Sequence, residues 1–389
     1  MKLFRRRRAT FERETIRIAQ EVLGGEIPVD PMPGLDAIAF DDVQLNLAGL
    51  RQHYRDLAPD EADAWLQSAL NELLIAEDTP DRTEDVDTLL PGLRARSFVE
   101  AHRLTALQRD ARHEPLAVRP ITDSVLVGLV WDRTHSLLSL PESLLHRWDR
   151  SYEEALAIAL SNLSSMPVLG WVGTDERIFR LVGGDEYVSA RLLTGGLFDR
   201  LPFGGDIVVC TPTSGDLFAA AADDPAALID MFEASLEASA RGRPVSLRPL
   251  RYSEGRWSDL LLDFGDPAYL AWRRLTRIDW AREADSTRRL LQDLVGTGVF
   301  VGSLIVRDEE ATGMTDTVSV WSEGVPTLLA AADLVAFPRS DRDAGFVTAS
   351  WDRVREVLSH RMAATDHYPE RWLVESFPSE EELSRLVTR

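Results

Sequence analysis

Apolar residues recur every three or four positions along several long segments, which places them on one face of a helix. The clearest case is residues 60–76, whose apolar face contains Ala62, Trp65, Leu66, Ala69, Leu70, Leu73 and Leu74. The same spacing predicts helices over 10–23, 225–240, 268–295 and 351–361. Gly296 is placed to end the longest of these helices.

Short apolar runs bounded by turn residues predict strands between the helices. Residues 124–131 (SVLVGLVW) and 135–140 (HSLLSL) are expected to form one hairpin. Residues 206–210 (DIVVC) and 216–222 (DLFAAAA) flank the turn TPTSG and predict a second hairpin. The other runs that predict strands are 168–172, 177–182, 299–306, 317–323, 333–337 and 372–374.

Two capping boxes mark helix starts, one formed by Ser151 and Glu154 and one by Ser379 and Glu382. Because strands and helices follow each other without a regular β-α-β-α order, the pattern predicts an α+β fold with mixed or antiparallel sheets, packed helices and several domains. The expected domains are a mainly helical N-terminal region with a basic tail (1–110), a central α+β domain (111–245) and a C-terminal α+β domain (246–389).

Charge is distributed unevenly along the chain. The formal net charge is −21, although residues 1–17 are basic, so the remainder is more acidic still. An acidic body repels phosphate backbones, which argues against nucleic-acid binding and suits a basic protein partner. The simpler interpretation is that the charge keeps the protein soluble. Residues 76–92 are acidic and rich in turn residues, so we expect an exposed, mobile loop that is cut first by proteases.

Several features predict a cytoplasmic protein without a transmembrane segment. No apolar run approaches the roughly 20 residues that a membrane helix needs, and no apolar stretch follows the basic start as a secretory signal requires. Cys210 is the only cysteine, so neither an internal disulfide nor a cysteine-built zinc site is expected. Its place in the run DIVVC predicts a buried, unreactive thiol.

The segment Gly183-Gly184-Asp185-Glu186-Tyr187 differs by one aromatic residue from the GGDEF signature of diguanylate cyclases. A metal-dependent phosphotransfer or hydrolytic enzyme could use Asp185 and Glu186 with Asp132, which ends a predicted strand. The rest of the cyclase pattern is missing, and Lys2 is the only lysine available to hold phosphates. We therefore interpret the segment as a solvent-facing turn without a metal, followed by an inward-packed stretch from Tyr187 to Leu193.

The solvent-facing turn predicts different effects for substitutions at Asp185 and at Leu192. If the carboxylate of Asp185 is solvated, Asp185→Ala leaves folding nearly intact, whereas Leu192→Ala creates a cavity and costs about 2–5 kcal/mol.

Histidines offer two further candidates. His360, Asp366 and His367 gather near a predicted helix end, but they lack the i, i+4 spacing that places two metal ligands on one helical face. His135 could pair with Asp132 as acid and base, although a surface contact at the hairpin is the ordinary interpretation. We assign no catalytic, cofactor or metal residue, and no cofactor is expected.

Four stretches of the chain resemble a bacterial family without an established activity, the YtpQ-like proteins. They are NLAGLRQHY (46–54), LVWDRTHSLLSLPESLLHRWDRSYEEALAIALSNL (129–163), DEYVSARLL (185–193) and GGDIVVCTPTSGDLFAAA (204–221). The resemblance covers roughly residues 30–240 and implies no particular chemistry. The sequence thus favours a non-catalytic protein that binds a protein or a small ligand, with the metal-dependent enzyme built on Asp132, Asp185 and Glu186 as the alternative.

Overall fold

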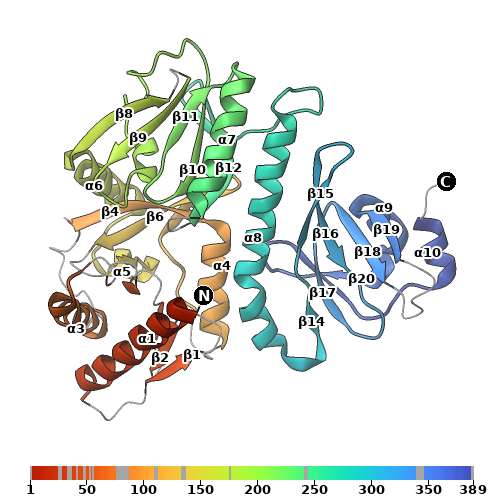
Figure 1. Cartoon of the computed structure of the whole chain (residues 1–389), viewed down its shortest axis with the longest axis horizontal. Helices are drawn as coiled ribbons and strands as arrows, with labels where there is room; N and C mark the ends of the chain where they lie inside the picture. The colour runs from red at the N-terminus through yellow and green to blue at the C-terminus, as the bar shows by residue number, and fades with distance from the viewer. Residues whose placement is uncertain are drawn as a thin grey trace. The chain divides into compact units, whose positions relative to one another are not determined.

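The computed structural model of the chain divides into two compact units (Figure 1). The first contains Met1–Leu90, Val130–Leu140 and Leu144–Ala159, and the second contains Pro91–Leu129, Pro141–Ser143 and Leu160–Arg389. The expected domain boundaries near residues 110 and 245 stay predictions. The structure describes residues 2–24, 29–32, 37–40, 43–46, 50–51, 54, 57–75, 86, 88–108, 113–132, 137–174, 177–240, 244–338 and 346–386.

The first unit is built on two helices, α1 (Lys2–Val22) and α3 (Pro59–Ile75), which pack against each other. Both helices were expected, but α1 begins at Lys2, so the basic start lies within a helix instead of forming a tail. A small antiparallel sheet consists of β1 (Asp30–Met32), β2 (Ala37–Phe40) and β3 (Val43–Asn46). The shared core contains Phe11, Ile18, Ala19, Val29, Ile38, Leu50, Leu66, Ala69 and Leu70.

A four-stranded sheet joins β4 (Leu89–Ala95), β5 (Val118–Pro120), β6 (Val125–Asp132) and β7 (Leu137–Ser139). The antiparallel pairing of β6 with β7 confirms the first expected hairpin. Two helices follow, α5 (Glu142–Arg147) and α6 (Tyr152–Ser165). Ser151 and Glu154 form the expected capping box, since each backbone N–H bonds to the other residue's side chain.

Strand β4 corrects the expectation of an acidic loop over 76–92. Most of that stretch lies outside the described residues, but its last residues enter β4, where Leu89, Leu90 and Leu93 are buried. Pro91 and Gly92 suggested a turn. The strand tolerates Pro91 because β4 lies at the edge of its sheet, where a backbone N–H is not needed for a second neighbour.

An antiparallel six-stranded sheet forms the middle of the second unit, in the order β13-β12-β10-β11-β9-β8. Helix α7 (Pro225–Ser239) covers one face of it (Figure 1). The pairing of β10 with β11 confirms the second expected hairpin. The strands are β8 (Val168–Thr174), β9 (Ile178–Gly183), β10 (Ile207–Thr213), β11 (Phe218–Ala221), β12 (Pro244–Ser253) and β13 (Arg256–Asp259).

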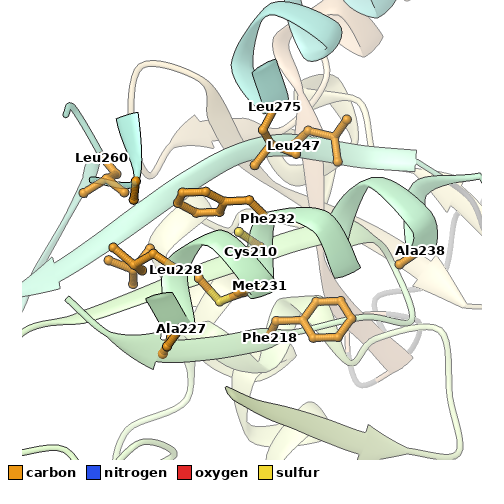
Figure 2. Packing of buried hydrophobic residues seen from close by; sticks show 13 residues of the cluster. Cys210, Phe218, Ala227, Leu228, Met231, Phe232, Ala238, Leu247, Leu260 and Leu275 are labelled. Atoms are coloured by element: carbon orange, nitrogen blue, oxygen red, sulfur yellow. The ribbon is translucent and has the colours of Figure 1, made fainter. Parts of the chain in front are cut away.

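The core between α7 and this sheet contains Cys210, which is fully buried (Figure 2). The thiol lies among Met231 and Phe232 of α7 and Leu247 of β12. Burial raises the pKa of this thiol to about 12. The predicted burial of Cys210 is therefore confirmed, and the predicted lack of reactivity stays a prediction, for which this burial is the physical reason.

The remainder of the second unit is organised by a long helix, α8 (Tyr269–Val295), which contacts β12, α4 (Arg96–Gln108) and α7. Gly296 ends α8 with a φ of 67°, as the sequence predicted. Two mixed four-stranded sheets follow, in the orders β14-β17-β21-β20 and β15-β16-β18-β19. Their strands are β14 (Phe300–Val301), β15 (Ile305–Glu309), β16 (Met314–Val320), β17 (Thr327–Ala330), β18 (Leu334–Pro338), β19 (Phe346–Ser350), β20 (Met362–Ala364) and β21 (Arg371–Val374).

The single strand expected over 299–306 is wrong, because β14 and β15 belong to different sheets. The chain leaves β14 at Gly302, whose backbone N–H donates to the carbonyl of Leu328 at 3.0 Å. The last helices are α9 (Trp351–Leu358) and α10 (Glu380–Leu386), and Ser379 and Glu382 cap α10 as expected. The α+β class with antiparallel and mixed sheets is confirmed.

Candidate functional site

The Gly183–Tyr187 segment follows β9 and is organised by a buried ion pair. Arg191 is 3% exposed, and its guanidinium donates to Oδ2 of Asp185 at 2.7 Å. The other carboxylate oxygen, Oδ1, accepts the backbone N–H of Tyr187 at 2.8 Å. Arg191 also donates to the backbone carbonyls of Leu163 and Met166. Both oxygens of Asp185 are thus engaged by the chain itself.

This geometry corrects part of the sequence interpretation. Gly184 and Glu186 are exposed, and Tyr187 packs inward, as expected. The side chain of Asp185, however, is only 15% exposed and neutralises Arg191. Its removal would leave a buried cation, so the expectation that Asp185→Ala leaves folding nearly intact does not fit the structure.

The carboxylates of the alternative metal site lie in different units. Asp132 ends β6 within the first unit, whereas Asp185 and Glu186 belong to the second. Glu186 accepts a hydrogen bond from the hydroxyl of Ser214 at 2.6 Å. Over the described ranges, no three or more His, Cys, Asp or Glu side chains are grouped so that they could hold a metal ion. The metal-dependent alternative stays a prediction, and no contact found here supports it.

The histidine candidates belong to separate ion networks. His360 contacts Glu382 at 2.9 Å, whereas His367 contacts Glu100 at 3.3 Å and Arg103 at 3.2 Å. Asp366 pairs with Arg103 at a longer distance, 3.5 Å. His135 lies outside the described residues.

A cavity of about 300 Å³, lined mainly by charged and aromatic residues, opens within the second unit among residues far apart in the sequence. Arg96 begins α4, Arg248 lies in β12, and Trp280 lies on α8. We call this cavity the arginine pocket. Its other lining residues come from the turn before β6, the end of β13 and the segment between β20 and β21: Asp123, Ser124, Asp259, His367, Tyr368 and Glu370. The volume is at the small end of the range for ligand cavities, about 300–1,000 Å³.

Both arginines of the pocket lie over aromatic rings. The guanidinium carbon of Arg96 is 4.6 Å from the ring centre of Tyr368, and that of Arg248 is 5.0 Å from the ring centre of Trp280. The only hydrogen bond from the Arg96 side chain to a described residue is a long one, 3.4 Å to the carbonyl of Asp123. The Arg248 side chain makes none with a described residue, since its Nε lies 3.6 Å from Asp279. Stacking fixes both guanidiniums and leaves N–H donors available.

Two buried carboxylates lie behind the pocket on α8. Asp279 is 1% exposed and accepts hydrogen bonds from Arg282 at 2.7 Å and from the backbone N–H of Leu247 at 2.9 Å. Glu283 is 4% exposed and accepts the hydroxyl of Tyr368 at 2.8 Å. Burial and the nearby charge of Asp279 raise the pKa of Glu283 to about 7.

Two carboxylates hold the segment from His367 to Tyr368: Glu100 contacts His367, and Glu283 accepts the hydroxyl of Tyr368. Burial raises the pKa of Tyr368, and the carboxylate of Glu283 adds to the effect, so the phenol remains a hydrogen-bond donor. Burial opposes the ionisation of Glu100, but hydrogen bonds from His367 and Arg103 outweigh it and lower the pKa of Glu100 to about 2. The pocket wall is therefore fixed by a hydrogen-bonded network, whereas the two arginines beside it donate no hydrogen bond to a carboxylate of the described residues.

A larger hollow of about 590 Å³ lies along residues 260–266. Aspartates dominate its polar lining, and Arg251, the arginine that lines it, is already paired with Asp206. The arginine pocket is the stronger candidate because Arg96 and Arg248 donate no hydrogen bond to a carboxylate of the described residues. Sequence patterns did not reveal it: its residues belong to separate elements, and only His367 had been singled out, for a different reason.

Comparisons of the chain with models of protein families, with curated proteins and with solved structures found no match. The resemblance to the YtpQ-like proteins therefore stays a prediction. None of the helices in the described part of the chain combines the length and the apolar composition that a membrane span requires.

Proposed function

We propose that the protein binds a small charged molecule in the arginine pocket and acts as a non-catalytic binding protein of the cytoplasm. The observation that carries the proposal is the state of Arg96 and Arg248. Both line a cavity, both are fixed on aromatic rings, and neither is hydrogen-bonded to a carboxylate of the described residues.

Physical chemistry favours a ligand at such groups. Nε of Arg248 is buried and has no hydrogen-bond partner among the described residues, and an N–H donor removed from water in this way costs about 1–3 kcal/mol. A guanidinium presents several donors in one plane, which matches carboxylate and phosphate oxygens. A bound anionic group would supply the acceptors that the chain does not.

A binding role fits the neighbouring groups better than a catalytic one. Burial raises the pKa of Glu283 to about 7, but this residue is almost fully buried and its oxygen Oε2 accepts the hydroxyl of Tyr368. It does not line the cavity, and the raised pKa of Tyr368 makes the phenol a poor acid. A cytoplasmic location is in keeping with a single, fully buried cysteine.

The test is a ligand-observed NMR screen of the full-length protein. The panel contains inorganic phosphate, small carboxylates, small amines and the L-amino acids. We expect at least one compound to bind wild-type protein and Arg251→Gln, the matched control in the larger hollow, and to lose binding in Arg248→Gln. If Arg248→Gln lowers stability, loss of ligand binding is measured instead in Arg96→Gln, whose guanidinium is more exposed. The absence of any binding, or binding unchanged in both pocket variants, overturns the proposal.

A further inference from the structure

The arginine pocket is lined by charges of both signs, and of its arginines and carboxylates only Arg248 has an ion-pair partner among the described residues. Asp123, Asp259 and Glu370 line it together with Arg96 and Arg248. Within the described part of the chain, none of these three carboxylates takes part in an ion pair. The only charged partner of Arg248 there is Asp279 behind the pocket, at 3.6 Å.

The carboxylates are kept from the arginines by other contacts. The hydroxyl of Ser124 donates to Asp259 at 2.5 Å, and the indole N–H of Trp372 donates to Glu370 at 2.7 Å. The arginines are in turn fixed on Tyr368 and Trp280. The two sets of charges therefore share one cavity without neutralising each other.

Both guanidiniums lie near Tyr368. Arg96 stacks on the ring of Tyr368, and both Arg96 and Arg248 act electrostatically on its phenol. Asp259 ends β13, next to β12 in the sheet, and its carboxylate is joined through Ser124 to the turn before β6. A small molecule in the cavity therefore meets two guanidiniums and three carboxylates, which we call the cationic wall and the anionic wall.

We infer that the arginine pocket binds a zwitterion of the α-amino acid type, with its carboxylate on Arg96 and Arg248 and its ammonium group facing Asp259, Asp123 and Glu370. This inference rests on the proposed function and narrows its ligand class. A simple anion leaves three carboxylates unpaired and is repelled by them. A simple cation leaves the two guanidiniums without an anionic partner and is repelled by them. A molecule that carries both charges satisfies both walls.

The test compares three molecules that share one side chain: L-leucine, 4-methylpentanoate, which lacks the ammonium group, and 3-methylbutylamine, which lacks the carboxylate. The same triplet is made for any other amino acid that the NMR screen selects. Dissociation constants are measured by calorimetry with the full-length protein. We expect the zwitterion to bind at least about tenfold more tightly than either counterpart, which corresponds to about 1.4 kcal/mol.

Two substitutions separate the walls. Arg248→Gln is expected to weaken binding of the amino acid and of the carboxylate at least about tenfold and not to weaken binding of the amine, which this guanidinium repels. Asp259→Asn is expected to weaken binding of the amino acid and of the amine and not to weaken binding of the carboxylate, which Asp259 repels. If Asp259→Asn disturbs β13, Glu370→Gln is used instead, and it is expected to weaken binding of the amino acid and of the amine. Arg251→Gln serves as the control and should match wild type for all three molecules.

The outcomes distinguish the two proposals. If the carboxylate or phosphate binds as tightly as the amino acid, and binding depends on Arg248, the pocket is an anion site: the proposed function stands and the zwitterion inference is overturned. If the amine alone binds and depends on Asp259, the inference is again overturned. If no molecule of the panel binds, both proposals are overturned.

Discussion

The ion pair between Asp185 and Arg191 makes the sharpest stability prediction. Asp185→Ala removes the only carboxylate that Arg191 contacts among the described residues, and it also removes the acceptor for the backbone N–H of Tyr187. Breaking a buried ion pair by removing one partner typically costs about 3–5 kcal/mol. Asp185 keeps 15% exposure, and carbonyls such as that of Leu163 still accept from Arg191, so we expect the lower end, about 3 kcal/mol.

The assay is urea unfolding followed by tryptophan fluorescence, with the adjacent carboxylate as control. Glu186 is exposed and has Ser214 as its hydrogen-bond partner, so Glu186→Ala should cost less than about 1 kcal/mol. A double-mutant cycle of Asp185→Ala with Arg191→Leu should show a coupling above about 1 kcal/mol. If Asp185→Ala and Glu186→Ala are equally mild, Arg191 is not the buried cation described above, and the solvated-turn interpretation is restored.

Three further predictions concern buried groups. Because the folded pKa of Glu283, about 7, lies above its ordinary value of 4.5, wild-type stability should fall as pH rises from about 4.5 to 7. Below this window both states hold the proton, and Glu283→Gln should lack this component; parallel melting curves against pH would refute it. Cys210 should resist thiol reagents in native protein and react once unfolded, and rapid native labelling would contradict its burial. Leu192→Ala should cost about 2–5 kcal/mol, clearly more than the same change at half-buried Leu193, as urea midpoints would show.

Local patterns in the sequence predicted much of the fold. The capping boxes, the glycine that ends α8 and the two hairpins follow from short-range rules that depend on a few neighbouring residues. The errors came where tertiary contacts override such rules. Pro91 and Gly92 suggested a turn but lie in an edge strand, and the apolar run 299–306 divides between two sheets at Gly302.

The candidate site could not be predicted in the same way. Arg96, Arg248 and Tyr368 lie far apart in the sequence, and no spacing rule brings them together. For Asp185, a local pattern suggested a role that the tertiary structure does not support. Its place beside a glycine pair suggested a solvated turn or a metal ligand, whereas its role depends on Arg191, whose burial no local pattern indicated.

The buried arginines of the second unit show why the arginine pocket, and not the Gly183–Tyr187 segment, is the place to look for a ligand. Arg191 uses its terminal nitrogens on Asp185 and on backbone carbonyls. Arg371 is fully buried without a carboxylate, but its terminal nitrogens donate to the carbonyls of Gly302 and Ala284, and burial lowers its pKa to about 10. In both cases the fold supplies acceptors for the cation that it buries. Arg248 is stacked and held in place, yet its side chain donates no hydrogen bond to any described residue. The terminal nitrogens of Arg191 and Arg371 are thus hydrogen-bonded by the chain, whereas those of Arg248, beside a cavity, donate to no described residue, and this contrast is why we propose a ligand there.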